Sequence, residues 1–480
     1  MTLRLLEQLA AHAKRTPDAP AVVRAATGSA VTWRELANQV GATAAAVSRD
    51  VAPGDVVMLA CPNDVRFVAS YLAVLAAGAC VFPVPPDATP AELSAVAERS
   101  GAAGAIGVDS AIHSLGVKFH FPLPSRDAAP GRLVARDTAR AGMLLQSSGT
   151  TGLPKIVFRT AAALDAVAAQ MVEAIGFTRD DRVLLCLPLC HSYGVEHGLL
   201  APIFAGSRVH LCDGFDLNLV RNQFADAGIT IFPGVPFMFE ALARLEGGET
   251  LPSLRRAYSA GGPLPPAVYD AFGSRYRVRV SQLYGATEIG SVTYGDPNAE
   301  GFDPAGVGRP MRGVSVRILD AGDPRPGRPL PPGAEGHVAV SAVSMLSNYV
   351  GDDTPTTVDG FFLTGDLGRL DPLGTLTITG RTKLLIDVGG RKVNPLEVEA
   401  VLAQHPMVER CVVVPVPVSD TVCRTKAIVV PRAGATLAPD ALRHFARDRL
   451  AAYKVPRVFE IRPTLPLSPT GKVLRHLVAA

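Results

Sequence analysis

Helical and short apolar strand signals alternate along most of this 480-residue chain, and this alternation restricts the possible folds more than any other feature. Residues 162–175 place apolar side chains three or four positions apart, a spacing that predicts a helix with one buried face, and Thr160 is a good N-cap for it. The apolar segments 182–187, 208–211 and 229–232 each predict a strand. This alternation predicts helices layered on a largely parallel sheet, in which ligands bind beyond the carboxyl ends of the strands.

The pattern changes after about residue 305. Short alternating strand signals at 314–318 and 336–340 flank a loop rich in proline and glycine, which predicts a small antiparallel unit. The last part of the chain has helical signals at 395–403 and 439–452 with strand signals between them. The expected fold class is therefore α/β, with a large N-terminal domain of layered sheets, a small antiparallel β unit and a small α+β C-terminal domain.

The composition is that of a globular protein without a strong charge. Hydrophobic residues make up 48% of the chain and charged residues 19%, which excludes a mainly disordered protein, and the net charge of +3 gives no argument for nucleic acid or an anionic membrane as a partner. Gly78 and Pro83 interrupt the apolar segment 67–84, so we expect a buried helix and a buried strand there rather than a membrane span. No signal peptide is recognisable, and we expect a cytoplasmic protein.

The seven cysteines include no Cys-x-x-Cys pair, and most lie in apolar segments, as is typical of buried thiols in a reducing compartment. Cys186, Cys190 and His191 lie close together in the sequence, so a metal site is one interpretation of this segment. Their spacing matches no common zinc pattern, and a strand followed by a loop is the better interpretation.

A loop rich in serine, threonine and glycine at 146–155 is the strongest local indication of function. It follows the apolar segment 143–145, and it offers backbone N–H groups, hydroxyls and one ammonium to an anion. The Walker A pattern is absent, so the usual P-loop nucleotide fold is not implied. A flexible polar turn is the alternative, but phosphate binding explains this set of groups better. The candidate phosphate-binding residues are Ser147, Ser148, Gly149, Thr150, Thr151, Gly152 and Lys155.

This loop resembles the signature of the adenylate-forming superfamily, which contains acyl-CoA ligases, nonribosomal adenylation domains and firefly luciferase. Segments similar to the other motifs of that superfamily follow in the family's order, at 188–194, 232–236, 259–262, 284–288, 364–366, 380–383, 388–395 and 469–475. An ordered series over the whole chain makes a chance match negligible. The resemblance implies ATP-dependent activation of a carboxylic acid to an acyl-adenylate and pyrophosphate, followed by transfer of the acyl group to a thiol.

The resemblance also implies how ATP is held. Thr287 would bond the α-phosphate, Glu288 would hold Mg²⁺, and Asp366 would accept hydrogen bonds from the ribose hydroxyls. Arg381 would reach the ribose or the phosphates, and Tyr284 would stack on adenine. Further residues would line the pocket of the base: Ala260, Gly261 and Gly262.

Lys472 is the residue that the resemblance assigns to the adenylation step. The lysine of this motif lies between the carboxylate and the α-phosphate and stabilises the charge that builds up there. His191 would shield the acyl site and does not need to act as a general base, because a carboxylic acid is already ionised at neutral pH. The candidate acyl-pocket residues are His191, Ser192, Tyr193, Val235, Phe237 and Gly285.

The resemblance divides the chain into an AMP-binding domain at 1–382, whose β-rich part spans about 305–380, and a mobile lid domain at 383–480. Lys383 is at the hinge position, and rotation about it would exchange Lys472 for the loop at Gly389 and Gly390. These two glycines would let a thin pantetheine arm pass close to the backbone.

The sequence leaves the acyl acceptor open. CoA is the first candidate, and the phosphopantetheine arm of a discrete carrier protein is the alternative. An inactive binding homologue is disfavoured, because Glu288, Asp366, Arg381 and Lys472 are all present. Adenylation domains for α-amino acids have Phe-Asp where this chain has Tyr193-Gly194, so an α-amino acid substrate is not expected.

Overall fold

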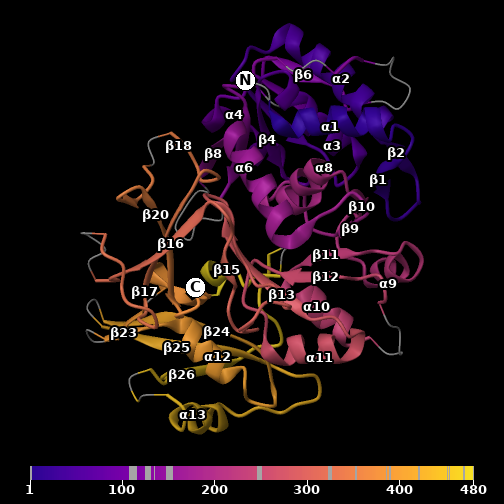
Figure 1. Ribbon diagram of the computed structural model, residues 1–480. Coiled ribbons are helices and arrows are strands. Elements are labelled where there is room, and N and C mark those ends of the chain that lie inside the picture. The colour runs from indigo at the N-terminus through magenta and orange to yellow at the C-terminus, as the bar shows by residue number, and fades with distance from the viewer. Residues whose placement is uncertain are drawn as a thin grey trace. The chain divides into compact units, whose positions relative to one another are not determined.

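The computed structural model describes residues 3–107, 116–124, 131–133, 136–147, 155–245, 251–322, 327–351, 354–384, 386–388, 391–419, 422–450, 452, 454–468 and 471–478. The chain divides into two compact units: unit 1 contains Met1–Ser315 and Val340–Thr356, and unit 2 contains Val316–Ala339 and Thr357–Ala480. In Figure 1 the colour runs from indigo at the start of unit 1 to yellow at the end of unit 2. Helices and strands alternate through both units, so the predicted α/β class is confirmed.

Two sheets form the framework of unit 1. Among the described residues the first has nine strands, in the order β15 (Arg309–Pro310), β14 (Gly290–Tyr294), β13 (Val280–Ala286), β12 (Arg256–Ser259), β11 (Ile231–Gly234), β9 (Arg182–Leu185), β10 (Arg208–Leu211), β1 (Pro20–Arg24) and β2 (Ala30–Thr32). The strands from β1 through β10, β9, β11 and β12 to β13 run parallel to their neighbours, as the sequence predicted. The second sheet has seven described strands, in the order β18 (Asn348–Val350), β8 (Ile156–Thr160), β7 (Gly142–Gln146), β4 (Cys80–Val84), β3 (Val56–Ala60), β5 (Gly104–Gly107) and β6 (Phe119–Phe121).

Helix α3 (Val65–Ala76) lies between the two sheets, because it contacts β3 and β4 of the second sheet and β1 of the first. Its side chains from Phe67 to Ala76 are buried, as expected for a helix that is apolar all round. Gly78, with φ of +81°, turns the chain into β4, so the predicted buried helix and strand in this segment are confirmed. Within the part of the chain that the structure describes, no helix has both the length and the hydropathy to cross a bilayer.

The helix predicted at 162–175 is α6 (Ala161–Met171), which continues as the π-helical turn η1 (Val172–Gly176). Thr160 caps it as predicted, since its side chain accepts a hydrogen bond from the N–H of Ala163. The other helical segments of unit 1 are α1 (Arg4–Arg15), α2 (Trp33–Asp50), α4 (Pro90–Ser100), α7 (Ser192–Val195), the π-helical turn η2 (Glu196–Leu200), α8 (Ala201–Ala205), α9 (Leu217–Asp226), α10 (Pro236–Ala243) and α11 (Pro266–Tyr276).

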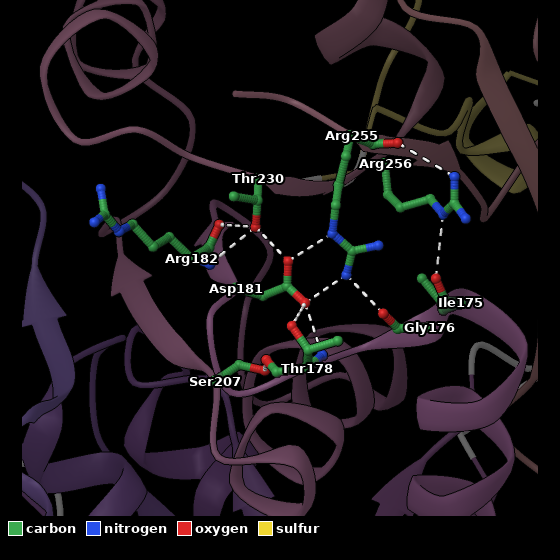
Figure 2. Close-up of polar contacts among 9 residues, drawn as sticks. All are labelled: Ile175, Gly176, Thr178, Asp181, Arg182, Ser207, Thr230, Arg255 and Arg256. Atoms are coloured by element: carbon green, nitrogen blue, oxygen red, sulfur yellow. Dashed lines mark hydrogen bonds and ion pairs between the residues drawn. The ribbon is translucent and has the colours of Figure 1, made fainter. Parts of the chain in front are cut away.

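A buried carboxylate ties the amino ends of three neighbouring strands together (Figure 2). Asp181, just before β9, accepts hydrogen bonds from Thr230 Oγ1 at 2.7 Å and from Arg255 Nε at 2.7 Å, and these residues stand just before β11 and β12. Arg255 also donates to the carbonyl of Gly176 at the end of η1. Burial acts to raise the pKa of Asp181, but the hydrogen bonds from Arg255, Thr230 and Thr178 outweigh it and hold the pKa below its ordinary value. This cluster braces the edge of the sheet opposite the edge where ligands are expected.

Three smaller sheets belong mainly to unit 2, and in the first of them residues 314–315 and 340–342 are assigned to unit 1. The described strands of the first are β16 (Val314–Leu319), β17 (Gly336–Ala342), β20 (Phe361–Leu370) and β19 (Thr357–Val358) in that order, with β21 (Leu376–Arg381) paired to β20. A short helix, η3 (Thr382–Leu384), leads to the pair β22 (Ile386–Val388) and β23 (Arg391–Val393). The last sheet has β24 (Val408–Ser419), β25 (Val422–Pro431) and β26 (Val458–Ile461), accompanied by α12 (Pro395–Leu402), α13 (Pro439–Arg447) and η4 (Arg475–Leu477). The helix predicted at 395–403 is α12. The helix predicted at 439–452 is α13, which ends earlier than predicted, at Arg447.

Candidate active site

Several of the predicted motifs lie at one edge of the nine-stranded sheet. Loops 188–194, 235–237 and 260–262 follow the carboxyl ends of β9, β11 and β12, and segment 284–288 ends β13 and continues beyond it. These strands are parallel neighbours, so their carboxyl ends meet at the same edge, where ligands of such sheets bind.

Thr287 and Glu288 lie in the turn between β13 and β14, and backbone groups of this turn are held by another loop of unit 1. The N–H of Leu346 donates to the carbonyl of Glu288 at 2.6 Å, and Ser344 Oγ donates to the carbonyl of Ile289 at 2.9 Å. The position of both predicted side chains therefore depends on a loop that follows them by more than fifty residues in the sequence.

Tyr349 links the carboxylate of Glu288 to the end of the predicted phosphate-binding loop. Its hydroxyl donates to Glu288 Oε1 at 3.3 Å, and Lys155 Nζ lies 4.5 Å from the centre of its ring. Both contacts follow from the pairing of β18 with β8, which sets Tyr349 opposite Val157. The sequence analysis assigned no role to Tyr349, because its partner Glu288 is 61 positions away.

The predicted phosphate-binding loop is described only at its two ends. The N–H of Ser147 donates to the carbonyl of Lys155 at 2.9 Å, so the loop leaves and rejoins the sheet at one place. Ser148, Gly149, Thr150, Thr151 and Gly152 lie outside the described residues.

The predicted adenine site combines buried and exposed groups. Tyr284 and Ala260 are buried, whereas Gly261 and Gly262 are exposed directly after β12. Gly261 has φ of +84°, a backbone conformation that a side chain would strain. The N–H of Ala260 donates to the carbonyl of Gly234 at 3.2 Å, which joins this loop to the end of β11.

His191 is exposed at the start of α7, and Ser192 and Tyr193 are partly buried. The hydroxyl of Tyr193 donates to the carbonyls of Gly234 at 3.0 Å and Tyr258 at 3.3 Å, and burial raises its pKa well above the usual value. These two hydrogen bonds connect α7, which begins next to His191, to β11 and β12.

Two further features restrict space at the predicted acyl pocket. A Cβ atom added to Gly194 would lie 2.0 Å from the carbonyl oxygen of Pro188, so the backbone here leaves no room for a side chain. A Cβ on Gly285 would lie 2.5 Å from the carbonyl oxygen of Gly290. Gly194 and Gly285 thus mark places where backbone alone can line the site.

The other two predicted acyl-pocket residues lie at the start of α10. Val235 is buried at its N-cap, and the ring of Phe237 meets that of Phe215 edge to face, with 5.5 Å between the ring centres.

Asp366 and Arg381 form an ion pair in unit 2. They are direct partners on β20 and β21, and Arg381 Nε donates to Asp366 Oδ1 at 2.5 Å. The Asp366 side chain is 3% exposed and the Arg381 side chain 43%, so the carboxylate is enclosed while the guanidinium reaches solvent. Gly365, with φ of +79°, donates to His337 Nε2 at 3.0 Å, directly before Asp366.

Lys472 lies in a tight turn near this ion pair. Its N–H donates to Ser468 Oγ at 3.1 Å, and the N–H of Ser468 donates to its carbonyl at 2.7 Å. Neighbouring protein atoms displace hydration from the ammonium and lower the pKa of Lys472, Arg381 lowers it further, and Asp366 raises it. The residue keeps an exposed surface, so three predicted residues converge at a place that solvent can reach.

The turn that carries Lys472 is anchored by Arg475. Its guanidinium makes a bidentate pair with Glu399 of α12, at 2.7 and 2.6 Å, and also donates to the carbonyl of Val413 at 2.9 Å. Burial raises the pKa of Glu399, although Arg475 acts in the opposite direction. The role of Arg475 was not foreseen from the sequence, because its partner is 76 positions away.

The hinge and the thiol channel stay predictions. Gly389 and Gly390 lie outside the described residues, and so does the side chain of Lys383. The predicted boundary between 382 and 383 also stays a prediction, as do the roles assigned to single residues.

Protein-family models match both parts of the chain. A model of the AMP-binding enzyme family matches residues 9–350, and a model of the AMP-binding enzyme C-terminal domain matches residues 397–472. The chain therefore belongs to the family of AMP-binding enzymes.

Known relatives match over nearly the full length. The sulfoacetate–CoA ligase of Cupriavidus necator is 29% identical, with 97% of this chain and 96% of that protein covered. A feruloyl-CoA synthase of an Amycolatopsis species is 31% identical, with the same coverage of 97% and 96%. The crystal structure of ATP-bound MatB from Rhodopseudomonas palustris superposes with a TM-score of 0.90 at 26% identity, covering 100% of this chain and 98% of that one. The chain is thus an AMP-forming acid–thiol ligase, which confirms the activity that the sequence predicted.

Proposed function

We propose that this enzyme uses ATP and Mg²⁺ to convert a carboxylic acid to an acyl-adenylate and then transfers the acyl group to CoA. The convergence of Asp366, Arg381 and Lys472 in unit 2 supports this proposal most strongly, because it groups a hydrogen-bond acceptor with two cations. A carboxylate accepts from sugar hydroxyls, and two cations neutralise a phosphate. The names of the two relatives favour CoA over a carrier protein as the acceptor.

In the first half-reaction a carboxylate oxygen attacks the α-phosphorus of ATP, and the bond from that phosphorus to the bridging oxygen breaks as pyrophosphate leaves. Both reactants are anionic, so the residues must mainly position them and neutralise charge. In this proposal Lys472 would neutralise charge on the attacking carboxylate and the α-phosphate, and Thr287 would donate to that phosphate. Tyr284 would stack on the base beside Ala260, Gly261 and Gly262, and Asp366 would accept from the ribose hydroxyls.

Glu288 is the residue that would hold Mg²⁺. Among the described residues it accepts a side-chain hydrogen bond from Tyr349 through Oε1, which leaves most of the carboxylate lone pairs for a cation. No cluster of three or more histidine, cysteine or acidic side chains suited to a metal occurs within the described ranges, and Mg²⁺ on ATP needs only one or two carboxylates beside phosphate oxygens. When bound, Mg²⁺ would neutralise phosphate charge.

In the second half-reaction the thiol sulfur attacks the acyl carbonyl, AMP leaves, and the thiol proton passes to solvent. We propose that Lys383 is the hinge for this step and that Gly389 and Gly390 line the thiol path. The closed space at Gly194 supports an acid without an α-ammonium group, because no side chain at this position can pair with one.

We also propose a cytoplasmic location. Six cysteines among the described residues are free thiols, which fits a reducing cytoplasm.

A panel of acids tests the proposal. Sulfoacetate, ferulate, short aliphatic acids and α-amino acids are each supplied with ATP, Mg²⁺ and either CoA or a phosphopantetheinylated carrier protein, and AMP, pyrophosphate and thioester are measured. We expect CoA thioesters of at least one acid that lacks an α-amino group. Transfer to the carrier protein only, or release of pyrophosphate with α-amino acids only, would contradict the proposal.

Lys472→Ala separates the half-reactions. Adenylation should fall by about 10²- to 10³-fold, the usual loss for one transition-state contact, while supplied acyl-adenylate is still converted to thioester. Lys426→Ala is the matched control, because Lys426 pairs with Glu460 elsewhere in unit 2 and should leave both half-reactions unchanged. An equal loss of both half-reactions in Lys472→Ala would show that the assigned role is wrong.

A further inference from the structure

An ion pair buried in unit 1 stands apart from the residues with an assigned role. Arg159 of β8 and Glu196, the first residue of η2, meet at 2.5 Å with side chains that are 0% and 2% exposed. Removing two charges from water is expensive and often outweighs their attraction, so the pair needs a reason beyond stability. The contacts of its two ends supply one.

Glu196 holds the chain directly after the Thr287–Glu288 turn. Its Oε2 atom accepts hydrogen bonds from the N–H of Ser291 at 3.1 Å and from Ser291 Oγ at 2.8 Å. These bonds to a carboxylate are charge-assisted and therefore stronger than neutral ones. The end of the turn is thus tied to η2 through one carboxylate oxygen.

Arg159 holds the same turn from its other side, through Ser344. Its Nε atom donates to the carbonyl of Ser344 at 2.9 Å, and Ser344 Oγ donates in turn to the carbonyl of Ile289 at 2.9 Å. The contacts therefore form a closed ring, which runs from Glu196 to Arg159, Ser344 and Ile289 and returns through the backbone to Ser291.

Gly290 lets the backbone of the turn lie directly on the ion pair. Its φ is +74°, and an added Cβ would lie 2.6 Å from Arg159 Nη2 and 3.1 Å from Glu196 Oε1. Both the conformation and the close approach require glycine here. The backbone of Gly290, at the start of β14, is therefore packed directly against the charged groups of Arg159 and Glu196.

From Ser291 the ring continues into a chain of hydrogen bonds to His197 and Tyr258, in which the donor and the acceptor of each bond can be assigned. Ser291 Oγ donates its one proton to Glu196, so it accepts the hydrogen bond that joins it to His197 Nε2 at 3.0 Å. In a neutral ring that donates from Nε2, Nδ1 is an acceptor, and it accepts from the Tyr258 hydroxyl at 2.8 Å. Burial lowers the pKa of His197 to about 3, in keeping with the neutral ring that this order requires. Tyr258 belongs to β12, which precedes the loop at 260–262, so the network joins both motifs.

We propose that Glu196 and Arg159 are positioning residues for adenylation, which hold the turn at 287–290 so that Glu288 and Thr287 meet Mg²⁺ and the α-phosphate in the reactive arrangement. The proposal rests on the proposed function for the roles of Thr287 and Glu288. A displacement of about 1 Å in a reacting arrangement can reduce a rate by about 10²-fold. Glu196→Gln should therefore lower the adenylation rate by about 10- to 100-fold.

The test measures Mg²⁺ dependence in two ways. One is the Mg²⁺ concentration for half-maximal stabilisation of the protein by ATP in thermal unfolding, which needs no acid substrate. The other is the Mg²⁺ dependence of ATP–pyrophosphate exchange with an accepted acid. We expect Glu196→Gln to raise both concentrations at least fivefold and to leave the KM for the acid within about twofold.

Asp181→Asn is the matched control. Asp181 also pairs with an arginine and is buried (Figure 2). It lies just before β9, at the amino ends of the strands of the nine-stranded sheet. It should lower the melting temperature without changing the Mg²⁺ dependence. If Glu196→Gln does not fold, Ser291→Ala and Ser344→Ala take its place in the test, because each removes a single hydroxyl of the ring. Each should raise the Mg²⁺ requirement, but less than Glu196→Gln would.

Glu288→Gln separates the two levels of inference. If it leaves the Mg²⁺ dependence unchanged, the assignment of Glu288 in the proposed function is wrong. If Glu288→Gln raises the Mg²⁺ requirement while the ring variants behave as Asp181→Asn does, the ion pair serves the fold alone and the positioning proposal is overturned.

Discussion

Arg381 donates from Nε to Asp366 Oδ1 at 2.5 Å, between residues that are direct partners on β21 and β20. The enclosed carboxylate is held in one orientation, and the positive charge of the more exposed guanidinium lowers the pKa of Lys472. Strand pairing thus creates the arrangement on which the proposed use of ATP depends.

Replacing Arg381 by glutamine should lower kcat/KM for ATP in adenylation by about 10²- to 10³-fold, because one cation near the phosphates is lost and Asp366 loses its partner. The pKa of Lys472 should rise in this variant, since Arg381 lowers it in the wild type. Steady-state kinetics across a range of pH measure both. Arg369→Gln is the control, because Arg369 is exposed on β20, the strand that pairs with β21. Equal losses in the two variants would contradict a specific role.

Tyr349→Phe should raise the Mg²⁺ requirement of adenylation and lower its rate by about 10- to 100-fold, in line with the roughly 1.5–3 kcal/mol that a hydrogen bond to a charged group contributes. The ring, and with it the contact to Lys155, is kept, so the free energy of unfolding should change little. Mg²⁺ titrations of ATP–pyrophosphate exchange measure the effect. Tyr276→Phe removes a hydroxyl bonded to the carbonyl of Leu242 and should leave the Mg²⁺ dependence as it is.

Arg475→Met should weaken adenylation at least tenfold, because the turn with Lys472 loses its bidentate anchor on Glu399. Arg475→Lys should lie between wild type and Arg475→Met, since lysine keeps the charge without the fork. Single-turnover adenylation and urea-induced unfolding measure rate and stability separately. Arg443→Met breaks an exposed pair with Asp440 and should cost less than about 1 kcal/mol. A wild-type adenylation rate in Arg475→Met would refute the anchoring role.

The pH dependence of stability should reveal the buried His197. Its pKa is about 3 in the folded protein and near 6.5 in the unfolded chain, so the unfolded state binds the extra proton between these values. Its contribution to stability is complete above pH 6.5 and is lost progressively as the pH falls toward 3. Below pH 6.5 the free energy of unfolding of the wild type should fall by up to about 1.4 kcal/mol per pH unit more than that of His197→Gln. Parallel slopes for the two proteins in urea unfolding would contradict the neutral, buried ring.

Local patterns were sufficient for the elements around the site. The apolar segment 208–211 is β10, and Thr160 caps α6 as its side chain allows. The helix and strand in 67–84 follow from Gly78, which stops the helix with a positive φ. Such features depend on neighbours within a turn or a strand, so the sequence contains their causes directly.

The contacts that hold the candidate site depend on residues far apart. Tyr349 and Glu288 are 61 positions apart, Ser291 and Glu196 are 95, and Arg475 and Glu399 are 76. No periodicity relates such pairs, because strand order and loop return bring them together.

The sequence by itself determined the family and the chemistry, because anionic reactants demand particular residue types at ordered places along the chain. Only the tertiary structure decided which side chains hold those residues, such as Arg159 and Glu196 at the turn of Glu288. Packing places these partners, and burial makes their hydrogen bonds directional, since a buried donor must find its acceptor within the protein.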